Sequence, residues 1–111
     1  MFQRATEGAL LVRLVKLAIP RCQAAERECP RTGPGRKPEI PDWVLAVMIV
    51  TGILQRKKTK IAQWTWWQQH AAEFAALLPG EHLPKRSTFY DRYRRAYKLY
   101  RVAIQAGRTS H

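Results

Sequence analysis

Acidic residues are scarce in this chain of 111 residues, which has 8 aspartates and glutamates against 20 lysines and arginines. The carboxylates form no close pair on one helical face, apart from Glu26 and Glu28, which diverge. Motifs of phosphate-binding loops, serine hydrolases and zinc proteases are missing as well. We therefore expect a protein that is not an enzyme and that needs no cofactor.

Cysteine and long apolar runs are also rare. Cys22 and Cys29 share a face of a continuous helix but lie too far apart for a disulfide, and no nearby histidine completes a zinc site. Two reduced thiols in a cytoplasmic protein are the simpler interpretation. The longest apolar run, residues 43–50, is far shorter than the ~20 residues of a membrane span, and the N-terminus lacks a signal-peptide core. We expect a cytoplasmic protein without a membrane segment.

Positive charge is what the chain has in excess, with a net charge of +12 and an isoelectric point near 10.6. Such a charge opposes a compact state by self-repulsion, so a polyanionic partner is expected, most commonly nucleic acid. Residues 85–111 alone hold 8 basic side chains and 1 acidic side chain. This concentration indicates a basic patch rather than a generally basic composition.

The apolar pattern predicts an all-α fold with four or five helices, because no stretch alternates with a period of two for long enough to form a strand. Residues 5–19 form an amphipathic helix that Pro20 ends or kinks, with a short polar continuation to residue 29. This segment is only modestly apolar, so we expect it to be loosely attached or to pair with a second copy of the chain. The chain divides into an N-terminal helical segment (1–29), a Pro/Gly-rich basic linker (30–41), a helical domain (42–107) and a frayed tail (108–111).

The central helix is predicted over residues 42–56, which are apolar nearly all round and should be buried on most sides. Asp42 suits its first turn, since a carboxylate is favourable at the positive end of the helix dipole. Gly52 costs roughly 1 kcal/mol against alanine in a helix. It therefore indicates either the close approach of a neighbouring helix or the end of this one.

Residues 59–78 have apolar side chains at helical spacing and form one helix, or two with a break near residues 69–70. Thr59 is the expected N-cap. The stripe that should face the core contains Ile61, Trp64, Trp67, Ala71, Phe74, Ala75 and Leu78. Trp66 falls off this stripe, so it either packs on a second neighbour or is exposed. Trp66 and Tyr90 are thus the better candidates for an exposed aromatic that stacks on nucleic-acid bases.

The last helix, residues 87–106, combines an apolar stripe with a dense positive charge and is expected to stop at Gly107. The apolar stripe contains Phe89, Tyr93, Ala96, Tyr97, Tyr100, Ala103 and Ile104. The basic residues, which we place on faces turned away from that stripe, are Arg92, Arg94, Arg95, Lys98 and Arg101. They extend over about 14 Å of helix axis, a length that fits a major groove or a run of phosphates. In a helix-turn-helix arrangement, residues 59–78 would support this helix as the DNA reader.

Three further groups of residues are candidates for phosphate contacts. They are the start of the last helix (Lys85, Arg86, Ser87 and Thr88), the turn after the central helix (Arg56, Lys57, Lys58 and Lys60) and the linker (Arg36 and Lys37). Helix N-termini offer free N–H groups to phosphate, and flexible basic arms contact the DNA backbone or minor groove. An ordinary helix cap, a solvated turn and a solvated linker are the alternatives at these three places.

Three motifs, taken in order, resemble the N-terminal region of bacterial insertion-sequence transposases of the DDE type. They are the Gly-Arg-Lys-Pro arm at residues 35–38, the apolar helix at residues 42–54, and Ser87 and Thr88 followed by Arg92, Arg94 and Arg95. The resemblance covers roughly residues 33–106. It implies recognition of transposon ends in double-stranded DNA, and dimerisation.

Catalysis in that family lies in a following RNase H-like domain, where three acidic residues hold two Mg²⁺ ions. The chain stops at His111, before the first of these acids is expected. The resemblance therefore implies a truncated copy or a fragment that binds DNA without cutting it, and Mg²⁺ is expected only for the missing domain. Two alternatives stay open: a protein-interaction or dimerisation module in which residues 5–19 pair with a partner and the basic face is only solvated, and an RNA-binding protein.

Overall fold

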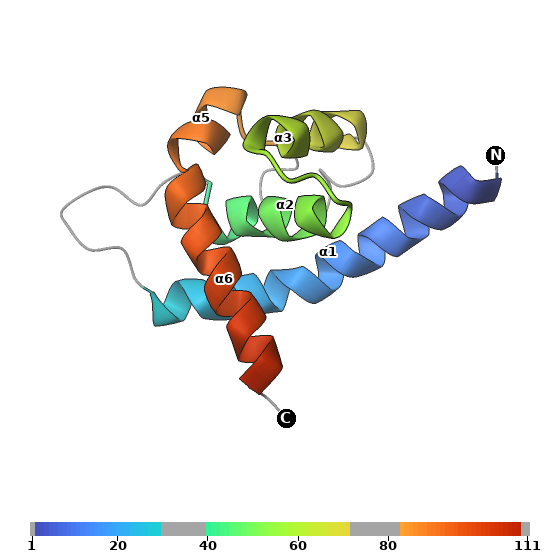
Figure 1. Ribbon diagram of the computed structural model, residues 1–111. Coiled ribbons are helices and arrows are strands. Elements are labelled where there is room, and N and C mark those ends of the chain that lie inside the picture. Colours follow the sequence, from blue (N-terminus) through green and yellow to red (C-terminus); the bar gives the residue numbers. More distant parts are fainter. Residues whose placement is uncertain (1, 30–39, 72–82, 110–111) are drawn as a thin grey trace.

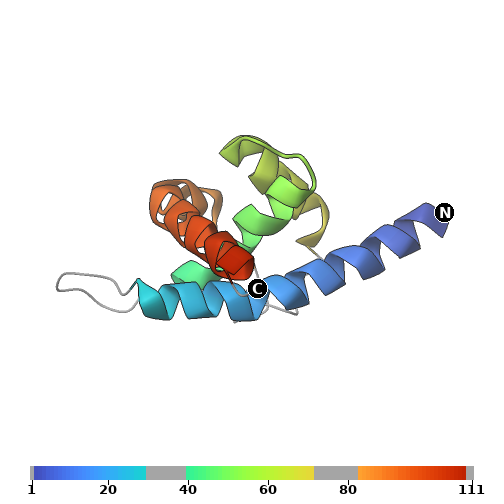
Figure 2. The same ribbon diagram turned by 60° about the horizontal axis from the view of Figure 1, so that its bottom comes forward.

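The computed structural model describes residues 2–29, 40–71 and 83–109, and side chains at 12–29, 40–71 and 83–105. Within these ranges all regular structure is helical, which confirms the predicted all-α fold. The helices are α1 (Phe2–Glu28), α2 (Asp42–Leu54), α3 (Lys60–Gln69), α5 (Arg86–Asp91) and α6 (Tyr93–Thr109). Helix α2 lies between α1 and α3, and α6 crosses α1 and α2 (Figures 1 and 2).

Helix α2 forms the centre of the core, as its apolar sequence predicts. Its side chains from Val44 to Ile49 are all buried, because α1, α3 and α6 pack around it. The Thr51 hydroxyl donates a hydrogen bond to the Val47 carbonyl, 2.8 Å away. The indole N–H of the fully buried Trp67 donates to the Met48 carbonyl at 3.0 Å. The buried polar atoms of this region are therefore satisfied within the core.

Helix α1 differs from the expectation of a short, loosely attached segment. It continues through Pro20 to Glu28, and its buried residues Val15, Ala18, Cys22 and Ala25 form one stripe that packs on α2 and α6. Pro20 is tolerated because it lies on the exposed side of the helix. The carbonyl four residues earlier, which lacks its usual N–H donor, belongs to an exposed residue that water can reach. From Val15 onward, α1 is part of the core.

Helix α3 ends at Gln69 with His70 as its C-terminal cap, so the break near residues 69–70 is the alternative that the structure shows. The Thr59 hydroxyl accepts a hydrogen bond from the Ala62 N–H at 3.1 Å, which confirms it as the N-cap. The predicted stripe is partly wrong, because Ile61 is 62% exposed. The buried residues of α3 are Trp67, as predicted, together with Gln63 and Trp66. Trp66 is therefore packed rather than exposed, and of its two alternatives the structure shows the first.

The rotation of α3 follows from a close contact between Gly52 and Gln63. A Cβ atom at Gly52 would lie 2.8 Å from Gln63 Cγ, so only glycine admits this approach. The Gln63 side-chain amide donates to the Lys57 carbonyl at 3.0 Å, and its oxygen accepts from the Tyr93 hydroxyl at 3.0 Å. The prediction of a close helix approach at Gly52 is confirmed, and Gln63 links α3 to α6 through a partly buried hydrogen bond.

The predicted last helix is in fact two, since Arg92 separates α5 from α6. Ser87 and Thr88 lie inside the short α5, whose N-cap is Lys85 without a side-chain hydrogen bond. Gly107 does not stop α6, which continues to Thr109. Helix α6 packs on α1 and α2 and has no comparably extensive contact with α3. Among the described residues, α1 and α2 carry α6 rather than the expected support helix, whose residues 72–78 lie outside the described residues.

Candidate nucleic-acid interface

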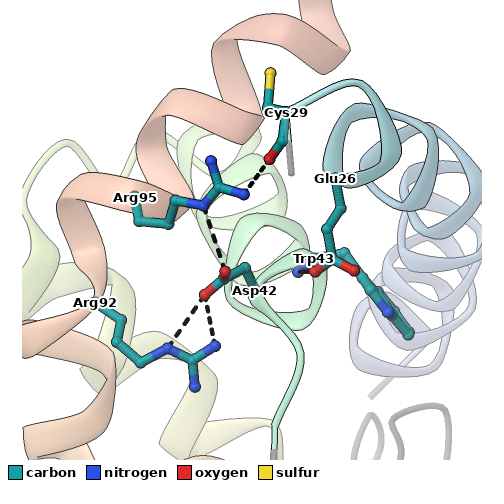
Figure 3. Close-up of polar contacts among 6 residues, drawn as sticks. All are labelled: Glu26, Cys29, Asp42, Trp43, Arg92 and Arg95. Carbon is teal, nitrogen blue, oxygen red and sulfur yellow. Dashed lines mark hydrogen bonds and ion pairs between the residues drawn. The ribbon is translucent and has the colours of Figure 1, made fainter. Parts of the chain in front are cut away.

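Arg92 and Arg95 point into the fold, toward the carboxylate of Asp42 at the start of α2 (Figure 3). The Asp42 side chain is only 2% exposed. Arg92 donates to its Oδ1 from Nη2 at 2.5 Å and from Nε at 3.2 Å, and Arg95 Nε lies 3.4 Å from its Oδ2. Arg95 also donates to the carbonyl of Cys29 just after α1. One carboxylate thus ties α6 to α2, and Arg95 ties α6 to the end of α1.

This cluster corrects the expectation that all basic residues of the last helix face away from the core. The side chains of Arg92 and Arg95 are only 17% and 22% exposed, and their guanidinium groups already bind a buried carboxylate. Both therefore hold the helices together, and neither is presented to a phosphate. A further polar contact stabilises the same end of α2, where Glu26 Oε2 accepts from the Trp43 N–H at 3.0 Å (Figure 3).

Three other cations of α6 with described side chains, Arg94, Lys98 and Arg101, are exposed. Their spacing of four and three residues places them on one stripe of the helix, about 10.5 Å long at 1.5 Å per residue. Lys60, at the start of α3, is also exposed, and its Nζ lies 5.3 Å from the centre of the Tyr90 ring. We call Arg94, Lys98, Arg101 and Lys60 the outer basic face.

Tyr97 lies at the surface beside the outer basic face, whereas Tyr93 and Tyr100 pack against the core. The sequence placed Tyr93, Tyr97 and Tyr100 on the apolar stripe, yet Tyr97 is 39% exposed and the other two are half-buried. The rings of Tyr93 and Tyr97 stack with centroids 6.0 Å apart, and those of Tyr97 and Tyr100 are 5.2 Å apart. The buried face of α6 contains Ala96 and Ala103, as predicted, and Leu99, which the predicted stripe left out. Burial raises the pKa of Tyr93, so its hydroxyl keeps the proton that it donates to α3.

Two open hollows flank Tyr97 on the surface. The first, of about 370 Å³, is lined by Lys60, Tyr90, Asp91, Tyr93, Arg94 and Tyr97. The second, of about 410 Å³, is lined by Tyr97, Tyr100, Arg101, Ile104 and Gln105. Tyr97 borders both, and each hollow has an exposed arginine at its edge. The first hollow also contains an acid, Asp91.

The other predicted phosphate contacts are distributed around this face. Lys85, Arg86 and Ser87 are exposed, but α5 has only six residues and its first turn is a weak anion site. In the turn after α2, Lys58 is exposed, and Lys57 is half-buried with its carbonyl bound to the Gln63 side chain. The predicted contacts Arg36 and Lys37 lie outside the described residues, as does the whole Gly-Arg-Lys-Pro arm.

The turn after α2 has a left-handed residue, Arg56, with φ of 63°. The Arg56 N–H binds the Ile53 carbonyl at 2.8 Å, and the Lys57 N–H binds the Gly52 carbonyl at 2.9 Å. These two bonds are those of a Schellman motif, where glycine is the usual residue at the left-handed position. The motif directs the chain from α2 toward Thr59 and so positions Lys60 next to Tyr90.

The described part of the chain has few groups suited to metal binding, thiol chemistry or membrane insertion. No cluster of three or more histidine, cysteine or acidic residues there is placed to hold a metal ion. Cys22 and Cys29 are free thiols, and burial raises the pKa of Cys22 to about 12. No helix in the described ranges combines the length and the apolar character that crossing a membrane requires.

Comparison with known proteins yields no match: no family, no characterised protein and no solved structure is significantly similar to the chain. The likeness to transposases therefore rests on the sequence motifs alone. The fold and the outer basic face are consequently interpreted from their own geometry and charge.

Proposed function

We propose that the chain binds double-stranded DNA through the outer basic face of α6. The observation that supports this proposal most directly is the division of the basic residues of this helix. Arg92 and Arg95 form ion pairs with the buried Asp42. Arg94, Lys98 and Arg101 are exposed on one stripe. Since α6 is carried by the core helices α1 and α2, these cations project from a fixed support.

The dimensions of the stripe suit a DNA backbone. Double-stranded DNA carries one negative charge per ~1.7 Å of helix axis, so a 10.5 Å stripe (about seven residues at 1.5 Å each) lies opposite several phosphates. The four cations of the outer basic face outnumber the acid beside them, Asp91, so the face carries a clear positive charge. Contacts of this kind provide affinity without base specificity.

The test is the salt dependence of binding to a labelled duplex, followed by fluorescence anisotropy. In the double variant Arg94→Ala/Arg101→Ala, the slope of log K against log [salt] should become shallower by about 1.8, which is ~0.9 for each lost phosphate contact. The matched control is Arg13→Ala/Lys16→Ala, which removes the same charge from exposed positions on α1. Equal losses in the two double variants would mean that only net charge matters and would refute the assignment to α6.

A more specific form of the proposal is recognition of transposon ends, as in the transposases whose N-terminal motifs the sequence resembles. Its support is the order of the arm, the apolar helix and the final basic helix. The test is competition between the DNA that flanks the gene and scrambled duplexes of equal length and composition. Preference for the flanking DNA is expected, and equal competition would refute this form while leaving DNA binding itself standing.

Pairing of two chains through α1 is a second candidate function, and one feature favours it. The N-terminal part of α1 extends past the other helices (Figure 1), and Leu17 is 64% exposed on its surface. Sedimentation of the wild type and of Leu17→Glu distinguishes a dimer that pairs through α1 from a monomer. A dimer that the substitution dissociates supports pairing through α1, whereas a wild-type monomer excludes it.

A further inference from the structure

We propose that Tyr97 is a stacking platform for an unpaired base of the bound DNA, with Arg94 and Arg101 holding the phosphates on either side. This inference rests on the proposed function, because it specifies the DNA that the outer basic face takes. It predicts a preference for DNA in which duplex continues into a single strand.

Tyr97 is the aromatic side chain best placed for such a contact. Among the described tryptophans, Trp66 and Trp67 are buried, Trp43 is half-buried against the core and Trp64 is half-buried against Phe89. Tyr97 is 39% exposed, although burying an aromatic ring is normally favourable. It borders both hollows on this surface, so a planar ligand in either hollow would lie next to it.

The hollows are large enough for bases, since about 370 and 410 Å³ exceed the space that one planar heterocycle needs. Tyr93 and Tyr100 hold the Tyr97 ring from within the protein, at 6.0 and 5.2 Å between centroids. The platform is therefore fixed before the base arrives, which lowers the ordering cost of binding.

Charge on both sides of Tyr97 identifies the ligand as a nucleotide strand rather than a neutral aromatic compound. Arg94 lies three residues before Tyr97 and lines the first hollow with it, and Arg101 lies four residues after Tyr97 and lines the second. Their separation of seven residues is about 10.5 Å of axis, the rise of roughly three stacked nucleotides at ~3.4 Å each. Lys60 adds a third cation at the first hollow.

The experiment compares a blunt duplex with the same duplex carrying a single-stranded overhang, at one salt concentration, for the wild type, Tyr97→Ala and Tyr97→Phe. Stacking on an aromatic side chain predicts that Tyr97→Ala weakens binding to the overhang DNA by about tenfold. Binding to the blunt duplex should change little, and Tyr97→Phe should behave as the wild type because stacking needs only the ring.

A 2-aminopurine base in the overhang provides a direct readout, because stacking on a ring quenches its fluorescence. Quenching on binding is expected for the wild type and Tyr97→Phe and should be lost in Tyr97→Ala. Wild-type affinity of Tyr97→Ala for the overhang DNA, with quenching retained, would overturn the platform. In that case the salt slope of Arg94→Ala/Arg101→Ala still reports on the proposed function. A wild type that binds neither DNA would overturn both proposals.

Discussion

Replacing Asp42 with alanine should destabilise the fold by about 3 kcal/mol. Its side chain is 2% exposed and faces two guanidinium groups. Removing one partner of a buried ion pair costs about 3–5 kcal/mol because the other charge is left without compensation. The lower end applies here, since the two arginine side chains are 17% and 22% exposed and regain some water. For a domain of this size the midpoint of thermal unfolding should fall by roughly 10–15 °C.

Urea unfolding followed by tryptophan fluorescence measures this change, because Trp67 is fully buried in the native state. Arg94→Ala is the control. Arg94 lies on α6 like Arg95 but is exposed, so its loss should leave the free energy of unfolding unchanged. Asp42→Ala and Arg95→Ala should be non-additive, as expected for groups in direct contact. A cost below about 1 kcal/mol for Asp42→Ala, or a value equal to that of Arg94→Ala, would refute the role of the ion-pair cluster.

Three further predictions concern stability. Gly52→Ala should destabilise the fold by about 1–3 kcal/mol, although alanine has the better helix propensity. The reason is that its methyl group would meet the Gln63 side chain. A gain in urea resistance would contradict this close contact. Arg56→Gly should stabilise by roughly 1 kcal/mol by relieving the left-handed backbone, and Arg56→Ala should give no such gain in the same assay. The raised pKa of Cys22, about 12 against an ordinary 9.0, means that the native state holds this proton longer. Stability should therefore fall with rising pH by up to about 1.4 kcal/mol per unit between these two values, and Cys22→Ala should show a correspondingly shallower alkaline loss.

Local patterns in the sequence were sufficient to predict much of the fold. The helical class, the burial of α2, the Thr59 cap and the close approach at Gly52 all depend on residues a few positions apart. The course of α1 was harder to predict, because proline within a helix usually disrupts it. Here Pro20 lies on the exposed side, and the buried stripe of α1 became recognisable only once α2 and α6 were in place.

The division of the basic residues could not be predicted from local pattern, because Asp42 and Arg92 are 50 residues apart in the sequence. A charged residue normally indicates a solvated face, so Arg92 and Arg95 were assigned to the outer surface together with Arg94. One signal was present: both arginines share a helical face with Ala96 and Leu99, and an acid begins the otherwise apolar α2. A buried acid that accepts from two guanidinium groups explains all of these positions.

The prediction for Tyr97 was wrong for a related reason. Tyrosine counts as apolar in a periodicity analysis, yet its amphipathic ring is as often found at a surface. Leu99, which the predicted stripe left out, is fully buried, whereas Tyr97 is the most exposed aromatic among the described residues of α6. The candidate site therefore gained an aromatic residue and lost two arginines relative to the sequence prediction.

The most direct test of the division between inward and outward basic residues is the salt dependence of duplex-DNA binding by Arg94→Ala and Arg95→Ala. Both variants lose one positive charge, at neighbouring positions. DNA binding is measured under conditions in which both variants are fully folded. Arg94→Ala should reduce the slope by about 0.9, while Arg95→Ala should keep the wild-type slope. Equal reductions in the two variants, or a reduction only in Arg95→Ala, would contradict the arrangement of α6 described above.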